Sequence, residues 1–249
     1  MGVLGDRTAL VTGGSRGIGR AVARRLARDG ARVAVHYGSD ETAAKETVGA
    51  IEAAGGSAFA IRAELGVPGD AERLWAEFDR RADGVDILVN NAGALFFASI
   101  GETDDEIYER AHAVNAKAPF FVIKHGLGRL RDEGRIINVT AMTDAAIPAI
   151  AATHMAKGAV TALTRSLAAE LAPRGITANS VAPGFVDTDL TREVLADPAA
   201  RAHAESVSVF QRVGTAEEVA DVVAFLASPD SRWVTGQHVD ASGGALLRL

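Results

Sequence analysis

The sequence of 249 residues contains no cysteine and no long uninterrupted apolar run. The absence of thiols excludes disulfide bonds and thiolate metal sites, and it is compatible with a reducing cytoplasm. No apolar stretch approaches the length of a membrane span, and residues 1–11 (MGVLGDRTALV) lack the basic and apolar regions of a secretion signal. We therefore expect a cytoplasmic protein that neither enters a membrane nor is secreted.

Clusters of basic residues and flexible linkers are also lacking. The formal net charge is −6, and lysine and arginine form no run, so a nucleic acid is not an expected partner. No linker, internal repeat or low-complexity segment divides the chain, and 48 % of its residues are apolar. This composition excludes a disordered chain and predicts one domain over residues 1–249 with a substantial buried core.

The sequence does contain a strict alternation of strand and helix signals. Apolar runs bounded by turn residues predict strands over 8–12, 32–37, 57–65, 86–93, 134–141, 176–184 and 236–244. Apolar residues at helical spacing predict helices over 20–30, 41–56, 71–84, 104–125, 151–171 and 215–227. This alternation implies parallel strands with helices on both faces, so the predicted fold class is α/β, with a single doubly wound sheet of the Rossmann type.

Three segments carry additional signals. The helix predicted over 104–125 is interrupted near Pro119. The helix over 215–227 begins at Thr215, with Glu217 and Glu218 in its first turn. Residues 184–211 form the least regular stretch and are predicted to be a mobile lid over the substrate.

A glycine-rich loop joins the first predicted strand to the first predicted helix. Its sequence, Thr12-Gly13-Gly14-Ser15-Arg16-Gly17-Ile18-Gly19, places glycines where the backbone must turn tightly and approach a pyrophosphate. The helix N-terminus then presents unpaired N–H groups and a partial positive charge to the phosphates. A tight turn with nothing bound is the alternative, but the flanking strand and helix favour a dinucleotide site.

Several spaced motifs resemble those of the short-chain dehydrogenase/reductase (SDR) family. TGGSRGIG (12–19) resembles the Thr-Gly-x-x-x-Gly-x-Gly fingerprint, and Asn90-Asn91-Ala92-Gly93 resembles the second motif of the family. Asn115 matches a helix asparagine, Pro183-Gly184 followed by Thr188 resembles the proline–glycine loop, and TGQHVDASGG (235–244) resembles the C-terminal strand. The resemblance covers essentially the whole chain, and motifs in the right order are more specific than any single one.

The resemblance implies a dinucleotide cofactor and a set of residues that bind it. Asn90 is expected along the adenosine and Glu64 near the adenine ring, whereas Thr188 and the backbone near Val186 are expected to hold the nicotinamide amide. Strand-end turns and caps are the alternative roles, above all for Glu64. The full set of expected contacts is Gly13, Ser15, Arg16, Gly17, Ile18, Gly19, His36, Tyr37, Gly38, Ser39, Glu64, Asn90, Ala92, Gly93, Lys157, Pro183, Gly184, Val186 and Thr188.

The end of the second strand decides between NAD(H) and NADP(H). A carboxylate there would bind the two ribose hydroxyls and repel a phosphate. The sequence has His36-Tyr37-Gly38-Ser39 with no carboxylate before Asp40, and Arg16 in the glycine loop can reach a 2′-phosphate. NADP(H) is therefore favoured over NAD(H). Family members that use NADP often carry an arginine where Gly38 stands, and a plain surface charge is the alternative role of Arg16.

The catalytic positions depart from the family pattern. In the family, a serine and a tyrosine bind the reacting oxygen, and a lysine four residues after the tyrosine holds the nicotinamide ribose and lowers the tyrosine pKa. Lys157 matches this lysine, and Asn115 matches the asparagine that helps to hold a water connected to it. Thr153 stands where the tyrosine belongs. Ala141, preceded by Thr140, stands where the serine belongs, in an alignment that can slip by one residue.

No shift of the alignment restores the tyrosine. The chain contains only Tyr37 and Tyr108, neither in this segment, and the longer spacing of enoyl reductases points to Ile150. A threonine hydroxyl is far less acidic than a phenol, and its short side chain ends nearer the helix. His154 is an acid with an accessible pKa, but it lies about 100° round the helix from Thr153, and a core or subunit contact is its alternative role.

Three functions fit these observations. The first is an NADP(H)-dependent reductase of unusual mechanism, acting on a small carbonyl, imine or conjugated-enone substrate of specialised metabolism, because hydride transfer is mainly the chemistry of the cofactor. Asn115, Thr153, His154 and Lys157 are then the candidate catalytic residues. The second is a non-redox cyclase, isomerase or dehydratase on the same scaffold, with acid–base work by His154, Thr140 or Asp144. The third is an inactive subunit that pairs with an active relative.

Two further expectations concern the loop after residue 141 and the assembly. Thr143 and Asp144 are additional acid–base candidates, with a cap or a solvent-facing position as the alternative. Family members commonly form tetramers through the helices that correspond to 104–125 and 151–171, whose alanine-rich faces allow close packing. A homotetramer or homodimer is therefore expected, with a hetero-oligomer containing another SDR, or ordinary core alanines, as the alternatives.

Overall fold

The computed structural model describes residues 2–143, 145, 147–245 and 247. Within them, seven parallel strands form one sheet in the order β3-β2-β1-β4-β5-β6-β7. The strands are β1 (Thr8–Val11), β2 (Arg32–Tyr37), β3 (Ser57–Arg62), β4 (Val85–Asn90), β5 (Leu130–Val139), β6 (Thr177–Pro183) and β7 (His238–Ala241). The predicted α/β class with a doubly wound parallel sheet is confirmed.

Both faces of the sheet are buried, because successive residues of each strand point to opposite sides. In β1, Ala9 and Val11 belong to one apolar cluster, whereas Leu10 belongs to another. The first cluster packs against α1 (Gly17–Arg28) and α9 (Ala216–Ala227). The second packs against α3 (Asp70–Asp79), α5 (Ala118–Gly126) and α6 (Ala151–Leu171). The apolar runs in the sequence therefore reflect strands that are covered on two sides.

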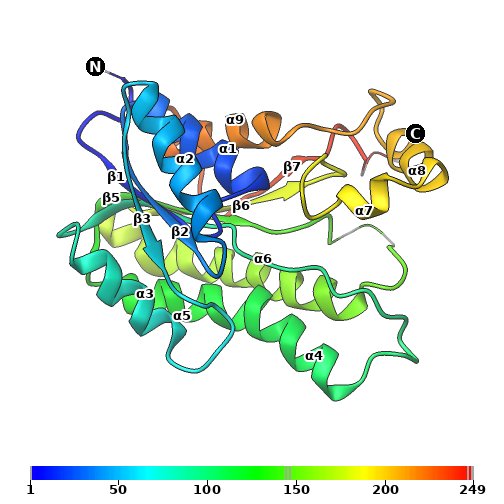
Figure 1. Cartoon of the computed structure of the whole chain (residues 1–249). Coiled ribbons are helices and arrows are strands. Elements are labelled where there is room, and N and C mark those ends of the chain that lie inside the picture. The colour runs from blue at the N-terminus through cyan, green and yellow to red at the C-terminus, as the bar shows by residue number, and fades with distance from the viewer. Residues whose placement is uncertain (1, 144, 146, 246, 248–249) are drawn as a thin grey trace.

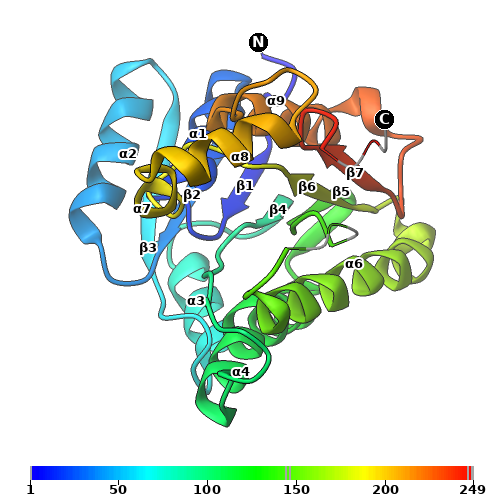
Figure 2. The ribbon, with the colours of Figure 1, turned by 90° about the vertical axis from the view of Figure 1, so that its right-hand side faces the viewer.

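The helices form two layers around the sheet (Figure 1). One layer contains α1, α9 and α2 (Glu41–Ala53), and the other contains α3, α5, α6 and α4 (Asp105–His112). Figure 2 shows the short α7 (Arg192–Leu195) and α8 (Pro198–Val207) on the side of α1 and α9. Three short helical turns complete the described elements: η1 (Ala113–Lys117), η2 (Ala172–Arg174) and η3 (Pro229–Ser231). Within the described ranges, none of the helices has the length and apolar character that crossing a membrane requires.

The structure explains the interruption predicted near Pro119. Residues Ala113–Lys117 form a π-helical turn between α4 and α5, and Pro119 lies in the first turn of α5. Proline has no N–H to donate to the carbonyl one turn earlier, so the regular ladder cannot pass through this point. A π-helical turn of this kind widens the helix, and such turns often occur at functional sites. Here it contains Asn115.

Residues 184–211 are more regular than predicted. They contain α7 and α8, and α8 begins with Asp197, whose carboxylate accepts from the Ala199 N–H, followed by Pro198 in the first turn. An aspartate followed by a proline is a standard helix start, but no helix is predicted here in the sequence analysis. By contrast, Thr215 caps α9 as expected, because its hydroxyl accepts from the Glu218 N–H while Glu218 accepts from the Thr215 N–H.

The strand order determines where a crevice opens. β1 pairs with β2 on one side and with β4 on the other. The chain leaves β1 toward α1 and leaves β4 toward α4, which lie in different layers. A crevice therefore forms beyond the carboxyl ends of these two strands, where doubly wound folds bind their ligands.

Asp86 joins three strands at the opposite end of the sheet. Its carboxylate accepts from the Thr8 N–H (2.8 Å), from Arg7 Nη1 (3.1 Å) and from Arg131 Nη1 (2.8 Å), and the residue is 4 % exposed. We predict that D86N lowers the free energy of unfolding by about 2–3 kcal/mol, because two cations and a buried N–H lose their shared anion. Urea denaturation would measure the change. D83N is the matched control, because Asp83 pairs with Arg131 at the surface and its loss should change stability little. Equal effects of the two variants would contradict the assignment.

Candidate active site

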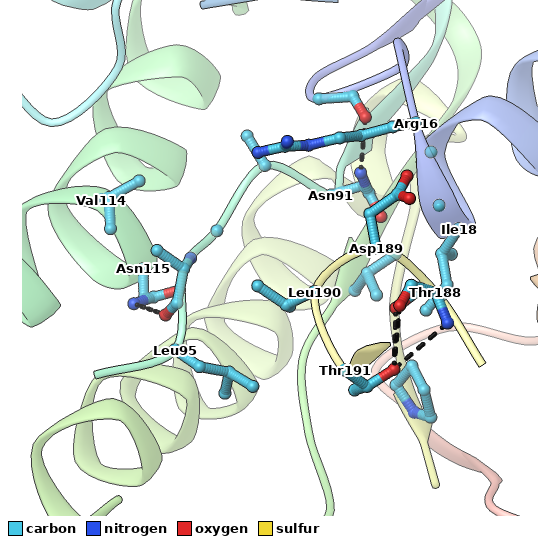
Figure 3. A pocket seen from close by; sticks show the side chains of 18 of the residues that line it. Arg16, Ile18, Asn91, Leu95, Val114, Asn115, Thr188, Asp189, Leu190 and Thr191 are labelled. Atoms are coloured by element: carbon cyan, nitrogen blue, oxygen red, sulfur yellow. Dashed lines mark hydrogen bonds between the residues drawn. The ribbon is translucent and has the colours of Figure 1, made fainter. Parts of the chain in front are cut away.

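A cavity of about 560 Å³ lies at the carboxyl ends of the central strands. This volume falls in the range of small-molecule and cofactor sites. It is lined by the glycine loop, the ends of β2 and β3, residues 91–95 after β4, the N-terminal turns of α6 and residues 183–195. Of the nineteen expected cofactor contacts, all except Asn90 line it, as do Thr140, Thr153, His154 and Asn115. Figure 3 shows a close view of this cavity.

The glycine loop is held against the end of β4 and against β2. Thr12 Oγ1 accepts from the N–H groups of Asn91 (2.9 Å) and Ala92 (3.0 Å). Gly13 adopts a φ of 62°, and its N–H donates to His36 Nδ1 (3.0 Å). A Cβ added at Gly19 would lie 2.1 Å from the Gly13 carbonyl oxygen, so only glycine fits there. These contacts explain why the sequence has glycines at these two positions.

His36 supports this loop as a neutral side chain. Since Nδ1 accepts from Gly13, Nε2 carries the proton and donates to the Ala63 carbonyl oxygen (2.8 Å). Burial lowers the pKa of His36 to about 4. His36 therefore connects β2 to the glycine loop and to the end of β3, and it brings no positive charge to the cavity at neutral pH.

Asn90 is the one expected cofactor contact that does not line the cavity, and its place along the adenosine stays a prediction. Asn90 is 5 % exposed, does not line the cavity, and donates from Nδ2 to Asn138 Oδ1 on β5 (2.9 Å). Side chains alternate along a strand, so the next residue, Asn91, points toward the glycine loop. Asn91 Nδ2 donates to the carbonyl oxygens of Thr12 (2.9 Å) and Gly13 (3.2 Å), and Asn91 lines the cavity.

Two arginines line the cavity: Arg62 lies where β3 finishes, and Arg16 directly precedes α1. Arg16 is exposed at the N-terminus of α1, and Figure 3 shows its side chain extended across the cavity. Arg62 Nε donates to the Gly38 carbonyl oxygen (3.3 Å), because Arg62 pairs with Tyr37 in the register of β2 and β3. Arg62 was not predicted from the sequence, because its proximity to Gly38 follows from the register between β2 and β3. The Asp40 carboxylate accepts from the Ala43 N–H and thereby caps α2.

Lys157, Asn115 and Gly93 meet at the other end of the cavity. Lys157 Nζ donates to the Val139 carbonyl oxygen (3.0 Å), and burial lowers the pKa of Lys157 to about 8. Asn115 bonds to both backbone groups of Ala94, donating to its oxygen (2.9 Å) and accepting from its N–H (3.2 Å). A Cβ added at Gly93 would lie 2.7 Å from Asn115 Oδ1 and 3.0 Å from Lys157 Nζ. The structure therefore brings the predicted lysine and asparagine together.

The two threonines near Lys157 bond to the backbone. Thr153 is 1 % exposed, and its hydroxyl accepts from the Phe96 N–H (3.2 Å). Thr140 is 6 % exposed, and its hydroxyl donates to the Val181 carbonyl oxygen (3.0 Å). Ala141, at the other candidate serine position, has no hydroxyl and also lines the cavity. Each hydroxyl thus contributes to holding neighbouring backbone segments in place.

His154 lines the cavity next to Thr153 but is not poised as an acid. Its Nε2 is buried without a hydrogen-bond partner, and burial lowers its pKa. The imidazole is therefore neutral at neutral pH. Of the loop candidates, Thr143 donates its N–H to the Ala141 carbonyl oxygen and does not line the cavity, and Asp144 lies outside the described residues.

Residues 184–195 contribute a wall of the cavity, within the segment 184–211 that is predicted to be a mobile lid. Thr188 lies against the glycine loop, because a Cβ added at Gly17 would be 3.4 Å from the Thr188 Cβ. Thr191 Oγ1 accepts from the Thr188 N–H (3.1 Å) and donates to the Val186 carbonyl oxygen (2.5 Å), as Figure 3 shows for Thr188. The remaining unpredicted lining is mainly apolar: Leu65, Ala94, Leu95, Phe97, Val114, Met142, Ile147, Phe185, Leu190, Val194 and Leu195.

Comparison with known proteins identifies the family. A family model described as enoyl-(acyl carrier protein) reductase matches residues 13–245. Versicolorin reductase 1 of Aspergillus parasiticus is 35 % identical over 254 residues, covering 97 % of each protein. The solved structure of the angucycline C-6 ketoreductase LanV with bound NADP is 46 % identical, with a TM-score of 0.95 over 98 % of this chain and 97 % of that one. The reductase LugOII, which catalyses keto-reduction at C1 during lugdunomycin biosynthesis, is 48 % identical, with a TM-score of 0.93 over 98 % of each chain.

The family match extends from the glycine loop almost to the C-terminus, and the similar proteins are covered over nearly their whole length. These similarities agree with the seven-stranded parallel sheet and with the glycine loop at its switch point. The chain belongs to the short-chain dehydrogenase/reductase family.

Proposed function

We propose that this protein is an NADP(H)-dependent reductase of specialised metabolism that reduces a carbonyl or another activated double bond without a tyrosine proton donor. The observation that carries the proposal is the cavity itself, which joins the glycine loop to Lys157 and Asn115 while Thr153 occupies the tyrosine position. LanV is described as an angucycline C-6 ketoreductase and LugOII as catalysing keto-reduction during lugdunomycin biosynthesis, which supports keto-reduction as the general reaction.

NADP(H) is the cofactor that the charges favour. The N–H groups at the start of α1 suit the pyrophosphate, and Arg16 and Arg62 suit a 2′-phosphate beside Gly38. Asp40 follows the end of β2 by three residues, and one of its carboxylate oxygens caps α2, so no carboxylate stands at the strand end itself, where an NAD site has one. The 46 % identical LanV was solved with NADP bound, which supports the same choice here.

Lys157 is the proposed ribose-binding residue. Its ammonium group lies beside Gly93 and Asn115, and a lysine in this place can donate to two ribose hydroxyls. When bound, NADPH supplies a hydride, and the protein has to position the acceptor and manage the proton. Asn115 positions residues 93–94, which form the floor next to Lys157.

The proton is the unusual part of the reaction. Both tyrosines of the chain lie in the described part: Tyr37 ends β2, and Tyr108 stacks on His112 in α4 (ring centroids 4.0 Å apart). In the sheet order, β2 is three strand spacings, roughly 14 Å, from β5, on whose end Lys157 is anchored. Tyr37 therefore lies at the adenosine end of the cavity, away from Lys157. Of the possible acceptors, a simple ketone depends most on an acid, which protonates the developing alkoxide. An iminium carbon is already cationic, and a conjugated enone can take its proton after the hydride.

We further propose that residues 184–211 close over the substrate and that the protein self-associates. Thr188, Asp189, Leu190 and Thr191 line the cavity from this segment, which supports its role as a cover. Phe120 in α5 and Met155 in α6 are large apolar residues at the surface (46 % and 57 % exposed), which supports a subunit contact of these helices.

Restoring the missing phenol should create ordinary ketone reduction. We predict that T153Y raises kcat/KM for an unactivated aryl ketone such as 1-tetralone by about 100-fold, the usual contribution of a positioned general acid. T153F is the matched control, because it adds the ring without the hydroxyl. Single-turnover NADPH oxidation, measured after NADPH binding has been verified for each variant, separates chemistry from binding. Equal rates for T153Y and T153F would show that the phenol is not what the site lacks.

The two arginines should discriminate between the cofactors. We expect R16A and R62A each to raise the Kd of NADPH by about tenfold, because each removes a charge-assisted contact to the 2′-phosphate, and to leave the Kd of NADH almost unchanged. Fluorescence titration would measure both constants. R28A is the control, because Arg28 is exposed at the other end of α1. A parallel loss of NADH affinity would indicate a general role in folding the loop.

Cofactor binding should weaken in alkaline solution. The pKa of Lys157 is lowered by burial to about 8, so its ammonium is present below this pH and is lost as the pH rises through it. We predict a constant NADPH Kd from pH 7 to 7.5 and, above pH 8, a rise that approaches about tenfold per pH unit. In K157M the Kd should be higher and independent of pH over this interval. A wild-type Kd that stays constant to pH 9.5 would contradict the role of Lys157.

A further inference from the structure

The side chains around Lys157 leave the reacting oxygen without an obvious acid. The Thr140 hydroxyl already donates to the Val181 carbonyl oxygen, and Thr153 accepts from Phe96. Neither aliphatic hydroxyl is acidic enough to release a proton to an alkoxide at neutral pH. His154 is neutral, since its buried Nε2 has no partner to stabilise a charge. Lys157 is held by the Val139 carbonyl oxygen and, in the proposed function, by the ribose.

The rest of this end of the cavity is apolar. Leu95, Phe97, Met142, Ile147 and Ile150 line it beside Thr153, and Leu190 faces them from residues 184–195. These side chains exclude water and suit a flat, apolar ring system. Among the described residues at this end, the acidic group that remains is the Lys157 ammonium, and it is engaged by the Val139 carbonyl oxygen and, in the proposed function, by the ribose. A proton donor on the substrate itself would meet the need of the reacting oxygen.

We propose that the substrate carries its own acid: it is an aryl ketone with a phenolic hydroxyl in the ortho or peri position, hydrogen-bonded to the carbonyl oxygen. This inference rests on the proposed function and specifies its substrate class. A phenol attached to the substrate replaces the phenol that Thr153 lacks, at the same oxygen and with similar acidity. The fixed geometry of the ring holds donor and acceptor together without help from the protein.

The step balances without another reactant. The carbonyl carbon accepts the hydride, and the π electron pair of the C=O bond moves to the oxygen. That oxygen takes the proton of the neighbouring phenol, whose O–H bond breaks to leave a phenolate. The phenolate then takes a proton from water. The ketone gains one hydride and one proton in total, and NADPH is oxidised to NADP⁺.

Three ketones with the same bicyclic skeleton test the proposal with the wild-type protein. 8-Hydroxy-1-tetralone has the hydroxyl beside the carbonyl oxygen, 8-methoxy-1-tetralone has that position blocked, and 5-hydroxy-1-tetralone has the hydroxyl on the far side of the ring. We expect kcat/KM for the 8-hydroxy compound to exceed both others by at least about 100-fold, the contribution of a positioned acid. In T153Y, where the protein supplies a phenol, this ratio should fall to below about 10, and in T153F it should remain high.

The outcomes separate this inference from the proposed function. Comparable reduction of all three ketones by the wild type overturns the inference, because the proton then comes from the protein or from water, while the reductase assignment stands. NADPH binding together with reduction by T153Y but none by the wild type, even of the 8-hydroxy ketone, also overturns the inference, because a phenol on the substrate then does not replace the phenol of a tyrosine. Failure to bind NADPH overturns both. If T153Y does not fold, the ratio between the 8-hydroxy and 8-methoxy ketones in the wild type alone decides.

Discussion

The active site depends on the close approach of the glycine loop to the end of β4. Thr12 accepts from two N–H groups of the segment after β4, and Gly19 lies so near Gly13 that a side chain at position 19 would collide with the loop carbonyl. Because β1 and β4 are neighbours whose chains leave to opposite faces, this contact sits where the sheet opens. This contact therefore fixes two parts of the site. The first is the N-terminus of α1, which suits an anion, and the second is the start of residues 91–95, which pass beside Lys157.

The second constraint is the burial of Lys157 beside Asn115. The π-helical turn before Pro119 turns the Asn115 amide onto both backbone groups of Ala94. Gly93 leaves just enough room for the lysine, whose ammonium is anchored on the end of β5. The cost of burying that charge is what lowers its pKa toward neutrality. A helix irregularity, a glycine and a strand end thus place one charged group in the wall of the cavity, at the end away from Arg62.

A threonine at position 153 changes which functions the protein itself can perform in the site. Its hydroxyl supports the backbone at Phe96, a structural task that a phenol reaching into the cavity would not perform. The protein retains the groups that suit nucleotide binding and an apolar wall that suits a flat ring system. In the proposed function, positioning and exclusion of water therefore remain with the protein, while the substrate supplies the proton. On this view, loss of the tyrosine narrows the range of acceptors without removing hydride transfer.

The sequence alone determined the order of strands and helices, the glycine loop and the cap at Thr215, because periodicity, capping and glycine stereochemistry act over a few neighbouring residues. It also showed that no tyrosine precedes Lys157 by one helical turn. It could not show that Asn91 rather than Asn90 faces the loop, that Arg62 comes beside Gly38, or that Leu190 and Leu195 line the cavity. Those facts depend on where a strand ends, on which strands pair and on packing between distant segments. Only the tertiary structure decides them, because such contacts join residues far apart along the chain.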